Sequence, residues 1–153
     1  MTDRIDIREI SSCTCLRARR ASRLLTQIYD RALKPAGLTV SQFGLLANLY
    51  GASLAGRRRS LSIGALAKRL GMDPTTLNRN LKPLAVRGLV ADAANREDRR
   101  IRAVLITDKG RIELRKAVPF WRRAQTGMQK ALGTEAALAL NSLLDFVSAK
   151  FER

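Results

Sequence analysis

The 153-residue chain contains no histidine, only two cysteines and one tryptophan, and aromatic residues make up 5% of it. Without histidine, the chain lacks the most common general base and the most common protein ligand of zinc and iron. We therefore expect no enzyme activity, no metal site and no cofactor. Its apolar runs are interrupted by Arg or Lys well before the roughly 18 residues that span a bilayer, and its first residues lack the apolar stretch of a secretory signal. We expect a cytoplasmic protein without a membrane partner.

Acidic residues are also scarce, because 29 Lys and Arg face 13 Asp and Glu, which gives a formal charge of +16. The net charge is +4 over residues 1–56, +10 over residues 57–116 and +2 over residues 117–153. Such a surplus costs self-repulsion in a compact fold, and it is typical of proteins that bind a polyanion such as nucleic acid or an anionic membrane surface. A generally basic, solvated surface is the alternative interpretation, but it does not explain why the charge is concentrated in the middle of the chain.

The hydrophobic residues, 46% of the chain, recur mostly with the spacing of amphipathic helices. This spacing predicts helices over residues 15–33, 42–50, 74–87, 109–132 and 135–151, with a shorter helix within residues 61–72. Residues 51–59 are expected to form a loop. Thr39 or Ser41 is expected to cap the second helix and Thr134 the last one, because their side-chain oxygens can accept from free backbone N–H groups.

Two of these predicted helices form a helix-turn-helix pattern, since Gly71 separates them and Asp73-Pro74 is a favourable start for the second. The N-terminal half of such a second helix enters the major groove of DNA. There Asn and Arg form bidentate contacts with adenine and guanine, whereas Thr contacts a phosphate or the thymine methyl group. The candidate DNA-binding residues on this helix are Thr75, Thr76, Asn78, Arg79 and Lys82.

Residues 89–92 and 101–107 predict two strands of a hairpin, because the second run is β-branched and alternates, and a polar segment joins the two. A hairpin with a basic tip is a wing, whose guanidinium groups reach phosphates or a narrow minor groove. The candidate wing contacts are Arg96, Arg99, Arg100 and Arg102. Asp98 is expected to orient a neighbouring Arg through an ion pair.

The apolar stripes of the first and the last two helices exceed what the core of a small helix-turn-helix domain can cover. We therefore expect them to meet a second copy of the chain. The predicted organisation is one chain over residues 1–153, with a DNA-binding region at 38–110 between dimerisation helices at 10–36 and 111–153.

The stretch LAKRLGMDPTTLNRNLKPLAVRGLV, followed by NREDRRIRAVLITDKGR, resembles the multiple antibiotic resistance regulator (MarR) family of bacterial winged-helix repressors. The resemblance implies a mostly α fold with a small β wing, in which a winged helix-turn-helix domain carries N- and C-terminal dimerisation helices. It also implies a homodimer that binds a pseudo-palindromic operator in double-stranded DNA and releases it when a ligand binds or a cysteine is oxidised.

The signal that such a regulator senses is left open by the residues. One interpretation is a small aromatic or phenolic acid that binds between the dimerisation helices and the winged domain. Phe43, Tyr50 and Trp121 are then the candidate lining residues, and Arg17 is the candidate partner of the carboxylate. The alternative for these aromatic side chains is a place in the core.

A second interpretation is a thiol-based sensor of organic hydroperoxides or of redox state. Cys13 and Cys15 lie near the start of the first long helix, at the positive end of its dipole. Tyr29, on the same helix, resembles the aromatic hydroxyls that position the thiol in such sensors. Structural thiols without a redox role are the alternative. A nonspecific basic nucleic-acid-binding protein is the remaining candidate function.

Overall fold

The computed structural model describes residues 5–55, 60–94 and 100–151, and these residues form a mostly helical fold with one small sheet. The elements are, in chain order, α1 (Ile7–Ser11), α2 (Thr14–Leu33), the 3-10 turn η1 (Lys34–Ala36), α3 (Val40–Leu54), β1 (Leu61–Ser62), α4 (Ile63–Arg69), α5 (Pro74–Val86), β2 (Val90–Ala94), β3 (Arg102–Ile106), α6 (Asp108–Leu132) and α7 (Thr134–Phe151). The predicted fold class, mostly α with a small β wing, is confirmed.

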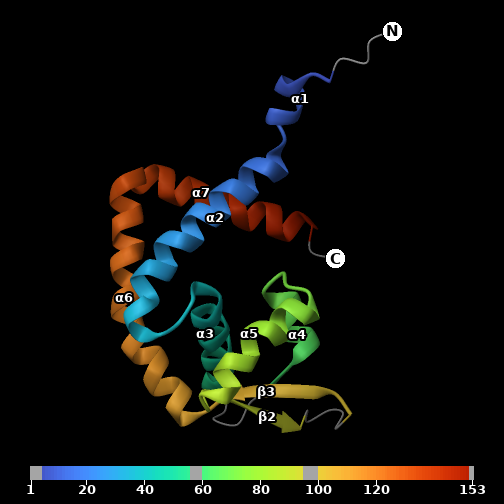
Figure 1. The fold of residues 1–153 in the computed structure, drawn as a ribbon, viewed down its shortest axis with the longest axis vertical. Coiled ribbons are helices and arrows are strands. Elements are labelled where there is room, and N and C mark those ends of the chain that lie inside the picture. Colours follow the sequence, from blue (N-terminus) through green and yellow to red (C-terminus); the bar gives the residue numbers. More distant parts are fainter. Residues whose placement is uncertain (1–4, 56–59, 95–99, 152–153) are drawn as a thin grey trace.

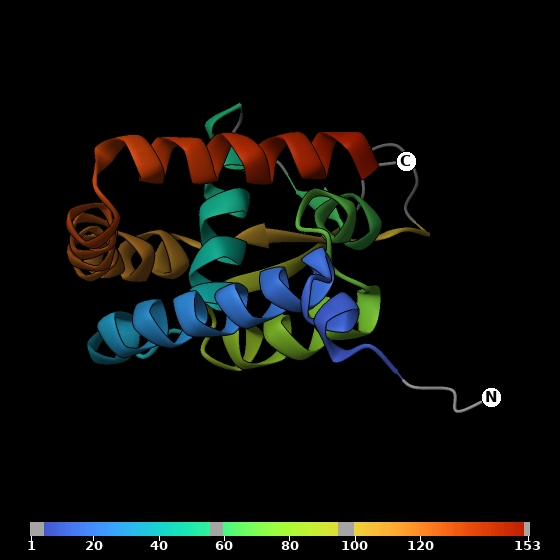
Figure 2. The same cartoon turned by 90° about the horizontal axis from the view of Figure 1, so that it is seen from above.

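The sheet lies at one end of the molecule, and helices α3, α4 and α5 pack against it (Figure 1). Its strands are antiparallel in the order β1-β3-β2, and the register pairs Val90 with Ile106 and Ala94 with Arg102. Helix α6 leads away from the sheet along one side of the molecule. Helices α2 and α7 both extend from α6 toward the same side, and the view from above separates them (Figure 2). The N-terminal end of α2 therefore lies at the opposite end of the fold from the sheet, whereas the C-terminal end of α7 lies on the same side of the molecule as α4 (Figure 1).

The hydrophobic core joins the sheet to α3, α4, α5, the end of α2 and the first half of α6. Leucine dominates it, as expected where amphipathic helices turn one face inward. The large side chains that are fully buried are Leu33, Leu45, Leu46, Leu49, Leu66, Leu77, Leu84, Leu89 and Ile106. All but Leu33 belong to the segment between α3 and α6, so this segment carries most of the core.

Short-range chemistry explains where most helices begin. Thr39 caps α3 in a capping box with Gln42, and Ser62 caps α4. Gly71, with φ of 59°, makes the turn between α4 and α5, a conformation that is costly for residues with a Cβ atom. Helix α5 continues through Pro83, so this proline does not break it.

The structure corrects four details of the sequence prediction. Helix α3 extends to Leu54, where a loop was predicted from residue 51, because its last turn contacts α6 through buried Ser53, which accepts from Arg111. Residues Leu61–Ser62 pair with Val104 and Ala103 as a third strand, which was not predicted, while Ser62 also caps the short helix that follows. An additional short helix, α1, precedes α2. Thr134 is the first helical residue of α7 and not its cap, because the Ala137 N–H donates to the carbonyl of Gly133.

No helix in the described ranges combines the length and hydropathy that crossing a membrane requires.

Candidate nucleic-acid interface

Helix α5 begins with a cap that its first residues build. The Asp73 carboxylate accepts from the Thr76 backbone N–H at 2.9 Å and from the Thr76 hydroxyl at 2.6 Å. These hydrogen bonds lower the pKa of Asp73, because they stabilise the ionised carboxylate. The bond from the Thr76 hydroxyl has the larger effect, and the bond from the Thr76 backbone N–H has the smaller one. The Thr76 hydroxyl proton is thus used within the helix, so Thr76 differs from the other candidate DNA contacts.

The remaining polar residues of α5 face outward. Thr75, Arg79 and Lys82 are exposed, whereas Asn78 is half-buried beside the wing. Leu77, Leu81 and Leu84, on the opposite side of the helix, are buried in the core. The helix therefore presents two cations and a hydroxyl from a surface that its leucines hold rigidly.

The wing places Arg102 next to these residues. The Arg102 Nε atom lies 2.9 Å from Asp92 Oδ1 of the neighbouring strand, and its guanidinium also donates to Asn78 Oδ1 of α5 at 2.9 Å. Arg100 is exposed at the start of the turn into β3. The other predicted wing residues, Arg96, Asp98 and Arg99, lie outside the described residues. The partner of Arg102 seen here, Asp92, was not predicted from the sequence.

The C-terminal end of α5 is held by α6 and by the turn after α2. Arg87, the C-cap of α5, donates to the Gly37 carbonyl at 2.6 Å and lies 4.0 Å from Glu113 of α6. Lys109 of α6 donates to the Arg87 carbonyl at 2.8 Å. A hydrogen bond from Lys116, and then its positive charge and that of Arg87, lower the pKa of Glu113. The first two turns of α6 thus fix the end of the candidate recognition helix.

A cavity of about 550 Å³ lies between α3 and α6, and its lining combines aromatic and apolar groups with arginines. The lining residues are Phe43, Ala47, Tyr50, Arg111, Leu114, Arg115, Val118, Pro119 and Arg122. The Arg111 guanidinium lies 5.8 Å from the Tyr50 ring centroid and donates to the Ser53 hydroxyl at 2.6 Å. Such a cavity has the volume and mixed lining of small-molecule sites in proteins. We name it the α3–α6 cavity.

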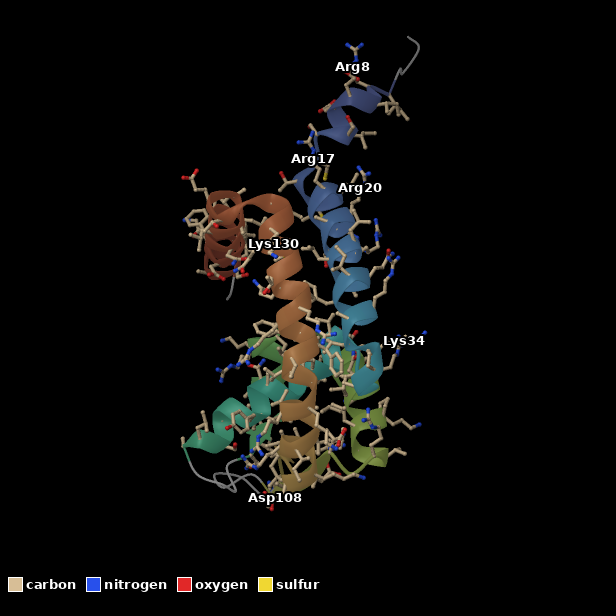
Figure 3. All side chains as sticks on the ribbon, turned by 90° about the vertical axis from the view of Figure 1, so that its left-hand side faces the viewer. Arg8, Arg17, Arg20, Lys34, Asp108 and Lys130 are labelled. Atoms are coloured by element: carbon tan, nitrogen blue, oxygen red, sulfur yellow. The ribbon has the colours of Figure 1, made fainter. Side chains whose placement is uncertain are left out.

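The structure brings together only some of the predicted effector residues. Phe43 and Tyr50 line the α3–α6 cavity, whereas Trp121 stacks on Phe43, with ring centroids 5.9 Å apart, and packs against the core. Arg17 lies near the N-terminal end of α2, at the opposite end of the molecule from Asp108 at the start of α6 (Figure 3). Arg17 therefore does not share the cavity. The arginines that do share it were missed, because only the packing of α6 on α3 directs them there.

A second groove, of about 710 Å³, runs between α2 and α7. Its wall is apolar apart from a few hydroxyl groups and Arg17, and it includes Leu25, Leu140 and Leu144. Large apolar side chains are exposed along α7: Leu138, Leu143, Leu144, Phe146, Val147 and Phe151. Ala137 is the one described residue of α7 that is buried. These two helices leave an apolar surface that the core does not cover.

Both cysteines are free and exposed at the start of α2. Cys13 occupies the N-cap position without a side-chain cap hydrogen bond, and Cys15 lies in the first turn. Tyr29 is buried further along α2, where its hydroxyl donates to Gln125 Oε1 at 2.6 Å, and burial raises its pKa. Cys15 and Tyr29 are fourteen positions apart on α2, a distance of about 21 Å at 1.5 Å per residue, so the two do not meet within one chain.

Comparison of the sequence and the structure with known proteins identifies related proteins. The profile of the MarR family matches residues 36–101, which contain α3, α4, α5 and β2. The transcriptional regulator MosR of M. tuberculosis, solved in complex with DNA, is 38% identical to the chain, with a TM-score of 0.72, and the match covers 91% of this chain and 98% of MosR. No curated protein sequence matches the chain.

Two further solved structures share the fold. BpsR of Bordetella bronchiseptica, solved to explain how 6-hydroxynicotinic acid regulates its DNA binding, is 25% identical, with 90% of this chain and 94% of BpsR covered and a TM-score of 0.75. A mutant MarR of E. coli, complexed with operator DNA, is 23% identical, with 94% and 99% covered and a TM-score of 0.78. The family profile matches only the segment from α3 to β2, whereas the structural match to MarR covers 94% of this chain.

Proposed function

The chain belongs to the MarR family of DNA-binding transcriptional regulators, and from this premise we propose that it is a sequence-specific repressor that binds a pseudo-palindromic operator as a homodimer. The observation that carries the proposal is the surface formed by α5 and the wing, where Arg79 and Lys82 lie outward and Arg102 contacts Asn78. Arginine and asparagine on a recognition helix read base edges in the major groove, and a wing arginine reaches phosphates or the minor groove.

The experiment that tests sequence specificity is selection of binding sites from random or genomic DNA fragments by the purified protein at physiological salt. We expect enrichment of an inverted repeat, because two copies related by a twofold axis read two half-sites. Featureless enrichment, with an affinity that salt abolishes, would instead support the alternative of a nonspecific basic nucleic-acid-binding protein.

The homodimer is proposed from the apolar surface of α2 and α7. Side chains such as Phe146 and Val147 stay 65% and 49% exposed in one chain, and a second copy offers the same surface for reciprocal burial. A twofold arrangement through these helices places the contact away from the sheet and the wing, which lie at the lower end of the fold in Figure 1. Sedimentation of the purified chain tests this, and a monomer at micromolar concentration would contradict it.

We propose that the effector is a small aromatic or phenolic acid and that it binds in the α3–α6 cavity. Tyr50 and Phe43 supply aromatic surface, and the arginines of α6 supply the positive charge for a carboxylate. In this proposal the partner of the carboxylate is Arg111, Arg115 or Arg122, instead of Arg17 as expected from the sequence. The regulation of BpsR by an aromatic acid supports this ligand class.

The same turns of α6 explain how a ligand would release DNA. Arg111 and Arg115 line the cavity, while Lys109 and Glu113, from the same two turns, contact Arg87 at the end of α5. Gly110 lies against the Leu89 carbonyl so closely that a Cβ atom would not fit. A shift of α6 on ligand binding therefore displaces the end of the recognition helix and the start of β2. Release requires only that the ligand binds more tightly to the shifted state.

Calorimetry with 4-hydroxybenzoate and its uncharged amide tests the effector class. We expect the acid to bind more tightly than the amide, and Arg115→Gln to remove this preference while the fold is kept, because Arg115 is exposed. Arg123→Gln is the matched control, since Arg123 belongs to the same helix but not to the lining of the cavity. Equal binding of acid and amide to the unaltered chain would contradict a carboxylate site.

Thiol sensing is the second candidate, favoured by the exposure of both cysteines at the N-terminus of α2. If Cys15 is the sensor, treatment with an organic hydroperoxide releases DNA from the unaltered chain, and Cys15→Ser no longer responds. Cys13→Ser shows whether the neighbouring thiol takes part. Release that persists in the double variant would contradict a cysteine sensor.

A further inference from the structure

One arginine joins three elements of the candidate DNA interface. Arg102 of β3 binds Asp92 of β2 through Nε and Asn78 of α5 through NH1, each at 2.9 Å. The strand register pairs Arg102 with Ala94 and Val104 with Asp92, so Asp92 and Arg102 are diagonal neighbours on one face of the hairpin. The guanidinium thus connects the two strands of the wing with the recognition helix.

The hydrogen bond to Arg102 sets the orientation of the Asn78 amide. A guanidinium only donates, so the Asn78 atom that faces Arg102 is the carbonyl oxygen, and the NH₂ group points elsewhere. The two amide orientations present different donors and acceptors to a base edge, and they read different bases. The base preference of Asn78 therefore depends on where Arg102 lies.

Asp92 is an unexpected neighbour for a DNA-binding surface. Its side chain is 71% exposed, and a carboxylate there repels phosphates, so its charge alone weakens DNA binding. An ion pair that is this exposed contributes little to stability. Its geometric effect is larger, because without Asp92 the Arg102 side chain, 57% exposed, is free to leave Asn78 for the nearest phosphate.

We propose that Asp92 is a specificity-determining positioning residue, which holds Arg102 in the geometry that orients Asn78 and does so without touching DNA. This inference rests on the proposed reading of DNA by α5 and the wing. It predicts that removal of the carboxylate has two opposite effects. Affinity for any DNA increases because a negative charge is lost, whereas discrimination between sequences decreases because Asn78 is no longer held.

The test uses Asp92→Asn in the full-length chain, with the site selected by the unaltered protein and a scrambled duplex of the same composition. Fluorescence anisotropy at several salt concentrations measures both affinities. We expect tighter binding to the scrambled duplex and a loss of discrimination of about tenfold. Circular dichroism of the variant should show an unchanged melting temperature, which excludes misfolding as the cause.

Arg102→Gln is the control that distinguishes an effect through Arg102 from a purely electrostatic effect of the Asp92 charge. If Asp92 acts through Arg102, adding Asp92→Asn to Arg102→Gln causes no further loss of discrimination. Asp92→Glu should restore part of the discrimination, because it keeps the carboxylate near Arg102. Unchanged discrimination in Asp92→Asn, or an equal loss in the Arg102→Gln background, would overturn the inference alone. Absence of any preferred site for the unaltered chain would overturn the proposed function together with it.

Discussion

The segment from α3 to the first half of α6 and the helix α7 both carry apolar side chains at helical spacing, but these side chains are buried in the first and largely exposed in the second. In the first region most leucines are buried, and in α7 most large apolar side chains remain exposed. Each helix has an apolar stripe, so periodicity alone does not distinguish them. The difference is that the stripes of α3, α4 and α5 converge on one sheet, whereas the stripe of α7 faces outward.

This difference separates what stabilises one chain from what joins two. The interior of the winged region accounts for the fold of a single chain, and the faces of α2 and α7 account for its proposed association. The proposed DNA-reading residues lie on the first region, on a helix whose leucines are buried in the core. In the proposed dimer, the second region would determine the distance between the two copies and hence between operator half-sites.

The largest expected effect breaks the core of the winged region. In a chain kept monomeric by Phe146→Glu, we expect Leu77→Ala to lower the free energy of unfolding by about 2–5 kcal/mol, because it opens a cavity beside fully buried neighbours. Leu138→Ala in α7, in the same background, should change it by less than about 0.5 kcal/mol. Urea denaturation measures both. Equal losses would show that α7 belongs to the core of the single chain.

The next effect concerns association. Phe146 is 65% exposed on α7, and we expect Phe146→Glu to weaken dimerisation by about 2 kcal/mol or more, as for aromatic residues at the centre of interfaces. Leu54→Glu is the matched control, because Leu54 is 71% exposed but lies at the end of α3. Sedimentation equilibrium measures the dimerisation constant of each variant. If only Leu54→Glu dissociates the dimer, the interface lies on the winged region.

A smaller effect separates the basic residues of the two regions. Arg79→Ala on α5 should cost about 1–3 kcal/mol on the selected site and little on a scrambled duplex, if Arg79 reads a guanine edge. Arg19→Ala, on the exposed side of α2, should affect both duplexes slightly and equally. An equal loss on both duplexes for Arg79→Ala would make Arg79 a phosphate contact.

The smallest effect is a pH dependence within α5. The folded-state pKa of Asp73 is lowered, so its cap stabilises the chain above the ordinary aspartate pKa and this stabilisation disappears as pH falls through the folded-state value. Asp73→Asn keeps a capping side chain that does not titrate. We therefore expect the variant to lose less stability than the unaltered chain between neutral pH and about pH 3, measured by urea denaturation. Parallel curves would remove Asp73 as a titrating contributor.

Features that depend on neighbouring residues could be predicted from the sequence. The start of α5 at Asp73-Pro74 is one example, and the choice of helix or strand for most segments is another. Features that depend on distant partners were missed. β1 is two residues long and forms only because β3 is beside it, and α3 extends past residue 50 because its last turn packs against α6.

The candidate site divides in the same way. Arg79 and Lys82 were predicted as outward-facing, because helical periodicity opposes them to Leu77 and Leu81. The hydrogen bond from Arg102 to Asn78 joins residues 24 positions apart, so it could not be predicted from a local sequence pattern. Arg111 and Arg115 are one turn apart on α6, a spacing visible in the sequence, but the cavity they share with Tyr50 depends on how α6 crosses α3.

The single tryptophan of the chain also has a spectroscopic consequence. Trp121 stacks on Phe43 at an interplanar angle of 15°, and Phe43 forms part of the wall of the α3–α6 cavity. The emission of the indole depends on its contact with that ring and on solvent access, and no other indole in the chain dilutes it. Intrinsic fluorescence of the unlabelled protein is therefore expected to respond to binding of the proposed effector in this one cavity, without an added label.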